Sequence, residues 1–195
     1  MNESRPSGCT YFSVDVEASG PVPGFYNLVS LGATAVTRGE DGRYRVGDSF
    51  YAEFRPVFPG QDPGANQVHG LDPERLARDG QDPRAALAAL SDFVARATEP
   101  GTAPTFVGHV AVFDWMYVAW YYAWAGLPNP FGYKGIDTKS MAMGALRLPW
   151  PETGKETLCA RLGLAEQDAP TVHRADADAA HQARLLVALL EHAGL

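Results

Sequence analysis

The stretch YFSVDVEASG, residues 11–20, decides how the chain begins to fold and where its chemistry lies. It reads as a strand, in which successive side chains point to opposite faces. Asp15 and Glu17 therefore point one way, while the apolar residues between them and before them point the other. Two carboxylates crowded onto one strand end repel each other unless a cation lies between them. Taken alone, such a pair is usually a solvated strand end, so the cation site depends on the rest of the chain.

After this stretch, the spacing of apolar residues predicts mainly strands in the first part of the chain and mainly helices in the rest. Strands are expected at residues 10–17, 28–37 and 44–54, as an antiparallel meander, with a short buried strand at 105–107. Residues 55–82 are rich in Pro, Gly and Asp and are expected to be mostly loop, with a short helix at 73–78. Longer helices are expected at 83–97, 113–124, 137–146, 156–162 and 175–192. This order predicts an α/β fold, a sheet flanked by helices.

Length and composition point to one domain. With 195 residues and 46% hydrophobic content, the chain can bury a substantial core, and we expect residues 1–9 to be a flexible tail before a single domain at 10–195. The polar start does not resemble a secretory signal, and the longest aromatic run, 118–127, is too short to cross a membrane. Cys9 and Cys159 are the only cysteines, which makes a disulfide improbable and the cytoplasm the default location.

The net charge limits the choice of partner. A charge of −7 fits poorly with tight binding to long duplex nucleic acid, because phosphate binding rests on Lys and Arg. Two divalent cations would add +4 and leave −3, starting from the formal −7. With two cations bound, we expect the protein to bind the end of a single strand, or a short oligonucleotide, rather than a long duplex.

Asp114 is a third acidic candidate, in GHVAVFDWMYV (residues 108–118). It falls one residue into an expected helix, where a carboxylate interacts favourably with the helix dipole. Its neighbours are apolar, however, and an aspartate in such surroundings usually has a buried partner. Both readings remain open on the residues alone.

His173 and Asp178 lie five residues apart in TVHRADADAA (residues 171–180). Five residues correspond to about 140° around a helix, so the two cannot share a helical face. We therefore expect His173 in the lead-in and Asp178 on the helix, which suits a mobile base beside a fixed ligand. His181 is a rival, since it follows Asp178 by three residues. His69 and His109 are each better explained as structural.

Together these residues resemble one family. The order DVE, GHxxxFD and HRAxxDA is similar to that of the DEDD superfamily of 3′–5′ exonucleases. The histidine five residues before the last aspartate marks the DEDDh branch, which includes polymerase proofreading domains, ribonuclease T and oligoribonuclease. The resemblance spans residues 10–192 and extends to the segments PGANQVHGL and IDTKSMA. It implies a ribonuclease-H-like fold, with a mixed five-stranded sheet flanked by helices.

The resemblance also implies a chemistry. Two divalent cations, Mg²⁺ or Mn²⁺, would lower the pKa of a bound water and neutralise charge on the scissile phosphate. Their ligands would be Asp15, Glu17, Asp114 and Asp178. His173 matches the general base, a role that suits imidazole because its unperturbed pKa of about 6.5 is close to working pH. The family's pattern further assigns substrate contacts to Ser19, Val68, His69 and Phe113.

Some positions depart from the family. Ala18 and Ser19 stand where many relatives have two threonines, and Val110 stands where many have asparagine. None of these is a ligand or the base, so the departures bear on substrate choice rather than on catalysis.

The leading hypothesis is a metal-dependent 3′–5′ exonuclease. It would hydrolyse single-stranded RNA or DNA, including short oligonucleotides, from a free 3′ end and release nucleoside 5′-monophosphates. A phosphodiesterase acting on a small nucleotide and a catalytically silent nucleic-acid-binding relative are the alternatives. The expected partner is a nucleic-acid 3′ end and not a membrane, and a homodimer is compatible with the family.

Overall fold

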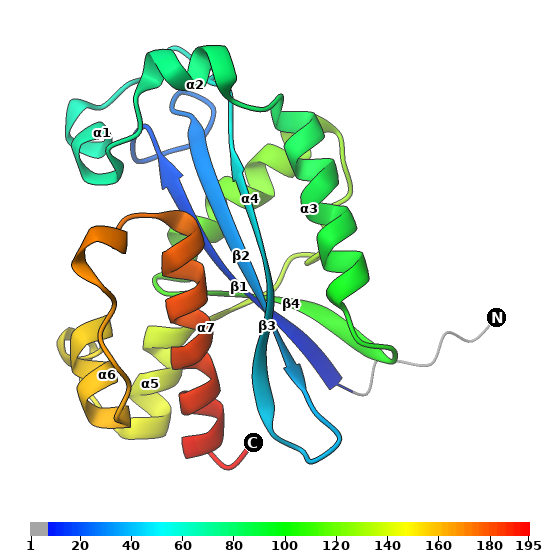
Figure 1. Cartoon of the computed structure of the whole chain (residues 1–195), viewed down its shortest axis with the longest axis vertical. Helices are drawn as coiled ribbons and strands as arrows, with labels where there is room; N and C mark the ends of the chain where they lie inside the picture. The colour runs from blue at the N-terminus through cyan, green and yellow to red at the C-terminus, as the bar shows by residue number, and fades with distance from the viewer. Residues whose placement is uncertain (1–7) are drawn as a thin grey trace.

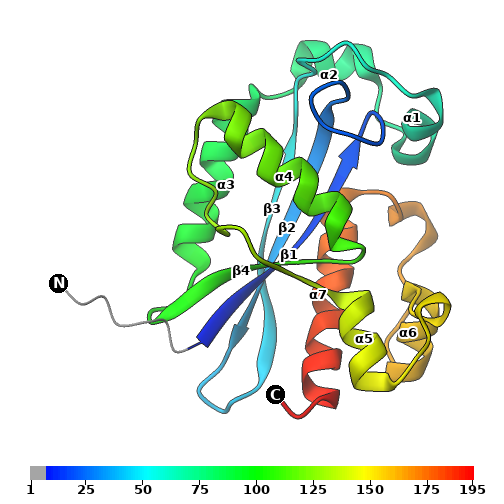
Figure 2. The same ribbon diagram turned by 180° about the vertical axis from the view of Figure 1, so that it is seen from behind.

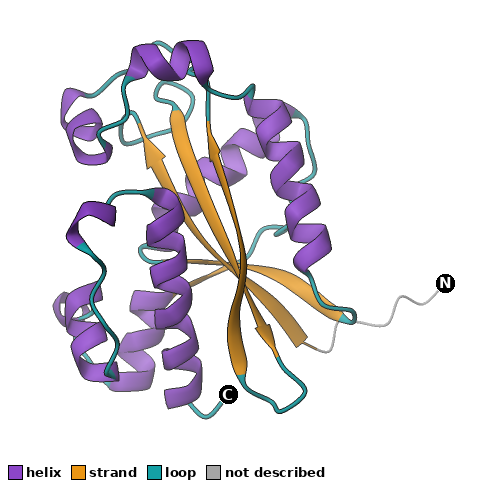
Figure 3. Cartoon of the chain, in the orientation of Figure 1, coloured by secondary structure: helices purple, strands orange, loops and turns teal. Residues whose placement is uncertain are grey.

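The computed structural model describes residues 8–195, and it contains a central sheet with helices on both faces (Figures 1 and 3). Residues 1–7, most of the predicted tail, lie outside the described residues. The strands are β1 (Gly8–Ala18), β2 (Leu28–Arg38), β3 (Tyr44–Glu53), β4 (Thr102–Gly108) and β5 (Gly135–Asp137). The α-helices are α1 (Pro63–His69), α2 (Pro73–Asp79), α3 (Pro83–Ala97), α4 (Ala111–Ala125), α5 (Thr138–Leu146), α6 (Lys155–Leu162) and α7 (Ala175–His192). Short 3₁₀ turns lie at Trp150–Glu152 and Ala169–Thr171.

The sheet has five strands in the order β3-β2-β1-β4-β5. β1 pairs antiparallel with β2, and β2 pairs antiparallel with β3. The β1–β4 and β4–β5 pairs are parallel. The mixed sheet that begins with an antiparallel meander is therefore confirmed, and β1, which carries the acidic pair, lies at its centre.

Helices cover the two faces differently. α3 and α4 pack on one face, while α7 packs on the other and is flanked by α5 and α6 (Figures 1 and 2). The core between the sheet and the α3–α4 pair includes Phe12, Val14 and Val16, as the alternation in β1 predicts. Tyr117 and Tyr121 of α4 are buried in the same core, where each large apolar side chain contributes about 1.5–3 kcal/mol. The acidic face of β1 is consequently turned toward α7.

Several elements differ from the sequence-based expectation: β4 is longer than expected, β5 was not among the expected segments, and β1 and α1 differ for reasons that the structure shows. β1 begins at Gly8 rather than at residue 10, because Gly8 and Cys9 pair with the start of β4, a long-range contact that no local pattern reveals. α1 lies in the segment expected to be loop. Asp62 caps it by accepting a hydrogen bond from the Gly64 N–H, and Gly70 ends it in the left-handed conformation.

Within residues 8–195, no helix is long and apolar enough to span a membrane.

Candidate active site

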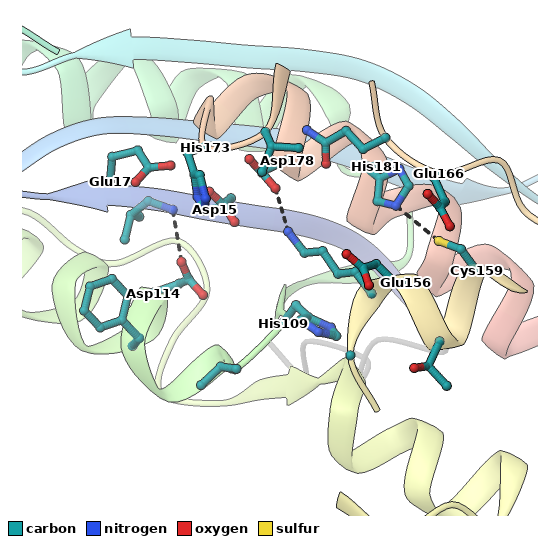
Figure 4. A pocket seen from close by; sticks show the side chains of 18 residues that line it. Asp15, Glu17, His109, Asp114, Glu156, Cys159, Glu166, His173, Asp178 and His181 are labelled. Carbon is teal, nitrogen blue, oxygen red and sulfur yellow. Dashed lines mark hydrogen bonds and ion pairs between the residues drawn. The ribbon is translucent and has the colours of Figure 1, made fainter. Parts of the chain in front are cut away.

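Three carboxylates meet near the carboxyl end of β1. Asp15 and Glu17 come from β1, and Asp178 comes from the first turn of α7 (Figure 4). Their ligand oxygens all lie within 4.8 Å of one another. Residues separated by more than 160 positions in the sequence therefore form one acidic cluster.

A glycine lets α7 approach the sheet closely enough to form this cluster. Gly32 of β2 lies directly opposite Asp15 in the β1–β2 register. A Cβ atom at Gly32 would lie 2.1 Å from the Ala175 carbonyl oxygen, at the start of α7. Any larger residue would push the helix away from the sheet, and Asp178 with it.

Asp114 lines the same cavity but approaches from the opposite helix layer. It lies in the first turn of α4 and is 4% exposed. Its Oδ1 accepts a hydrogen bond from the Val16 N–H at 3.0 Å, which ties α4 to the acidic strand. Asp114 is not one of the three closely grouped carboxylates, although it faces the cavity beside them. It therefore has a buried partner, as its apolar sequence neighbours suggested.

The cluster is electrostatically unfavourable without a cation. Burial, followed by repulsion from Asp178, raises the pKa of Asp15 to about 7, against the opposing effects of Lys155 and Gln182. Burial and repulsion from Asp15 raise the pKa of Glu17 to about 8. Burial, followed by repulsion from Asp15, also raises the pKa of Asp114 well above its ordinary value. Removing a carboxylate from water and placing it beside another both disfavour the charged form.

The donor set fits a hard divalent cation. The three grouped side chains offer only oxygen atoms, which Mg²⁺ and Mn²⁺ prefer over nitrogen and sulfur. The Asp178 Oδ2 atom is buried and has no hydrogen-bond partner among the described residues. An unpaired buried carboxylate oxygen is costly, and coordination of a cation would satisfy it.

The three histidines of the cavity differ in their surroundings. The His109 Nδ1 atom hydrogen-bonds with the Thr138 hydroxyl at 2.9 Å, and burial lowers the pKa of His109 to about 4. The His181 ring is 2% exposed and its Nε2 atom lies 3.3 Å from the Cys159 sulfur. His173 is exposed and lies before α7, in the lead-in where its spacing from Asp178 placed it.

His173 also has an unusual backbone conformation. Its φ is +62°, in the left-handed region that residues with a side chain rarely adopt. Within the part of the chain that is described, its ring has no hydrogen-bond partner, although it lines the cavity with the acidic cluster. Of the three histidines, His173 is the one whose ring is available to a substrate.

Comparison with known proteins assigns the chain to a family. No family model matches it. Over 174 residues it is 32% identical to the 3′–5′ DNA exonuclease Cap18 of Escherichia coli, an alignment that covers 89% of this chain and 86% of that protein. The nuclease domain of 3′hExo, a DEDDh family member whose structure was determined with bound rAMP, superimposes with a TM-score of 0.77. That match is 15% identical and covers 96% of this chain and 94% of the other.

The chain belongs to the DEDDh family of 3′–5′ exonucleases. The family is one of hydrolytic nucleases, and its ribonuclease-H-like fold is the fold described above. Exonuclease I of E. coli, in complex with a dT13 oligonucleotide, shares this fold with a TM-score of 0.69 at 19% identity. The match covers 94% of this chain but only 41% of exonuclease I.

The cavity of this DEDDh exonuclease has a volume of about 780 Å³ and extends from the acidic cluster to Cys159 and His181. Of the four predicted substrate contacts, Phe113 lines it. Ser19 is fully buried, and its hydroxyl donates to the Gly60 carbonyl and accepts from the Asn27 N–H. The structure therefore gives Ser19 a role in holding the loop after β1 and does not bring it to the cavity.

The other two predicted contacts lie on α1, outside the residues that line the cavity. Val68 is 52% exposed. His69 is buried, and its Nδ1 accepts a hydrogen bond from the Leu71 N–H at 3.0 Å. The family assignment does not by itself test these two contacts.

Two residues at the cluster were not singled out from the sequence. The Lys155 ammonium lies 2.6 Å from Asp178 Oδ1, and the Gln182 amide donates to Asp15 Oδ1 at 2.6 Å. Gln182 follows Asp178 by four residues, so the helical period placed it on the same face of α7. Lys155 begins α6, and nothing in its local sequence distinguishes it from a solvated lysine.

Proposed function

We propose that this DEDDh exonuclease hydrolyses single-stranded nucleic acid from a free 3′ end, with two divalent cations, and releases nucleoside 5′-monophosphates. The observation that carries the proposal is the convergence of Asp15, Glu17 and Asp178, with a buried and unpartnered oxygen on Asp178, in the cavity that His173 also lines. DNA is the first candidate substrate, because the relative with 32% identity is named a DNA exonuclease. The oligonucleotide complex of exonuclease I supports single strands as the form bound.

Each proposed catalytic residue has a distinct task. Asp15, Glu17, Asp114 and Asp178 would hold the two cations, either Mg²⁺ or Mn²⁺. When bound, these cations lower the pKa of the attacking water and neutralise charge on the scissile phosphate. His173 would accept the proton of that water as its oxygen bonds to phosphorus. The bond from phosphorus to the 3′ oxygen would then break, and that oxygen would stay on the shortened strand and take a proton from solvent to give the new 3′ hydroxyl.

The protein supplies rigidity around the ligands and mobility at the base. The Val16 N–H holds Asp114, and the Gln182 amide holds Asp15, so two carboxylates are oriented before any cation binds. Preoriented groups need no rearrangement during the reaction. His173, by contrast, is exposed and outside the helix, which lets its ring follow the substrate.

Phe113 is proposed as a substrate contact from the cavity wall, where an aromatic ring can stack on a base or sugar. Val68 and His69 stay predictions, as do a cytoplasmic location, a homodimer and the assignment of residues 10–195 to a single domain.

A substrate series tests the proposal. Single-stranded DNA and RNA of equal sequence, from dinucleotide to long oligomer, would be incubated with the protein and Mg²⁺ or Mn²⁺. The proposal predicts hydrolysis of the longer strands and faster degradation of DNA than of RNA. Hydrolysis restricted to the dinucleotide would instead identify a phosphodiesterase acting on small nucleotides.

A further inference from the structure

The cavity contains a single permanent cation. Among the described residues that line it, six carry carboxylates, and Lys155 is the only lysine or arginine. The chain has 16 basic residues in total, so the scarcity is local. A site that attracts a phosphodiester needs positive charge, and apart from bound metal this cavity has one residue to supply it.

Lys155 interacts directly with a proposed metal ligand. Its Nζ atom lies 2.6 Å from Asp178 Oδ1, and the two side chains are 28% and 7% exposed. The other oxygen of Asp178 is left buried and unpartnered. The Oδ1 atom of Asp178 is therefore paired with the Lys155 ammonium, and its Oδ2 atom has no hydrogen-bond partner among the described residues.

The influence of Lys155 extends across the whole cluster. The oxygens of Asp15, Glu17 and Asp178 lie within 4.8 Å of one another, so the ammonium that contacts Asp178 lies close to all three carboxylates. In the absence of metal, Lys155 is thus the one lysine or arginine, among the described residues that line the cavity, that can offset the repulsion among these carboxylates.

The side chain is also placed so that it can move. Lys155 is the first residue of α6, it follows Gly154, and no side chain caps this helix end. The Lys155 ammonium lies at the end of a flexible four-carbon chain. This side chain can therefore reorient without disturbing α6, which is anchored by the buried Leu158 and Cys159.

We propose that Lys155 neutralises Asp178 in the metal-free protein and, when a divalent cation displaces it, binds the phosphate of the substrate. This inference rests on the proposed function, and it adds a residue that competes with metal and then contacts nucleotide. The charges of the proposed ligand set agree with it: the four ligand carboxylates balance two divalent cations, so the lysine released from Asp178 can pair with the phosphodiester. A lysine that merely held α6 against α7 would affect stability but neither of these binding events.

Binding measurements separate the two roles from turnover. Mn²⁺ would be titrated calorimetrically into the wild-type protein, Lys155→Met and Lys155→Gln. Both variants remove the charge, and glutamine can keep a hydrogen bond to Asp178 should methionine disturb the fold. Because a competing cation is removed, the affinity for Mn²⁺ is expected to rise about tenfold, which corresponds to about 1.4 kcal/mol of binding free energy. Lys139→Met is the matched control, since Lys139 lies over the Trp150 ring and does not line the cavity.

The second titration uses dTMP in the presence of saturating Mn²⁺. Lys155→Met and Lys155→Gln are expected to bind dTMP about tenfold more weakly, while Lys155→Arg, which keeps the charge, retains most of the affinity. Lys139→Met should match the wild-type protein in both titrations.

The results decide between the inference and its alternatives. An unchanged or weaker Mn²⁺ affinity in folded Lys155→Gln would overturn the competition, and unchanged dTMP binding would overturn the phosphate contact. Either result leaves the exonuclease proposal intact as long as the wild-type protein binds Mn²⁺ and shortens DNA. Failure of the wild-type protein to bind Mn²⁺ would instead count against the proposed function.

Discussion

The start of α4 carries a backbone strain whose size can be measured. Val110 precedes the helix with φ +66° and ψ +50°, the left-handed conformation, which is unfavourable for a residue branched at Cβ. Most L-residues pay about 1–2 kcal/mol there, whereas asparagine adopts it readily. Replacing Val110 by asparagine or by alanine removes the same apolar contact, so the two variants differ in backbone preference and in the ability of asparagine to cap α4, and both differences favour asparagine. We expect Val110→Asn to be more stable than Val110→Ala by about 1 kcal/mol.

The same pair of substitutions at Val112 provides the control. Val112 lies within α4, is 75% exposed and has no left-handed backbone. Helix propensity favours alanine over asparagine there by up to about 0.7 kcal/mol, so the order of the two variants should reverse. Thermal and urea unfolding followed by circular dichroism measure both pairs. For a chain of this length, about 1 kcal/mol corresponds to roughly 2–4 °C in Tm. If alanine is the more stable replacement at both positions, the reasoning from backbone strain is refuted.

Three further predictions concern the site itself. Asp178→Asn should lower turnover by at least about 10³-fold and reduce the Mn²⁺ bound in calorimetry, because it removes the charge of a ligand while keeping the shape of the side chain. Wild-type rates with unchanged metal stoichiometry would contradict the ligand assignment. His173→Ala should slow hydrolysis by about 10²–10⁴-fold with Mn²⁺ affinity unchanged, and a loss seen only in His181→Ala would transfer the role of base to that residue. The pKa of Asp15 is raised to about 7 and that of Glu17 to about 8, so the folded state binds protons more tightly than the unfolded state. The stability of the metal-free protein should therefore fall as pH rises from about 4 to about 8. Mg²⁺ should restore Tm most at the alkaline end, and a metal-free Tm that rises with pH would show the sign to be wrong.

Local patterns predicted the framework of the fold well. The two-residue alternation in β1 correctly separated the buried residues Phe12 and Val14 from the acidic face. Both ends of α3 and of α7 were predicted at the correct residues, and the sheet expected from the family was confirmed. Such signals are strong because each element has one face that must be buried.

Contacts between distant segments were the part that local patterns missed. The interaction of Lys155 with Asp178 requires α6 and α7 to lie together, and neither residue's neighbours indicate it. Ser19 shows that sequence position does not reveal which partner a hydroxyl has. Its position after the acidic pair suggested a substrate contact, but its hydroxyl is used by the loop that brings Asn27 and Gly60 together.

The most direct test of the central claim is the dependence of hydrolysis on the 3′ end and on metal. Labelled single-stranded DNA with either a free or a blocked 3′ end would be incubated with the protein and Mg²⁺ or Mn²⁺, and then with chelator. We predict stepwise release of nucleoside 5′-monophosphates from the free end alone, stopped by the chelator. Degradation that continues after chelation, or that begins within the blocked strand, would contradict a metal-dependent 3′–5′ exonuclease.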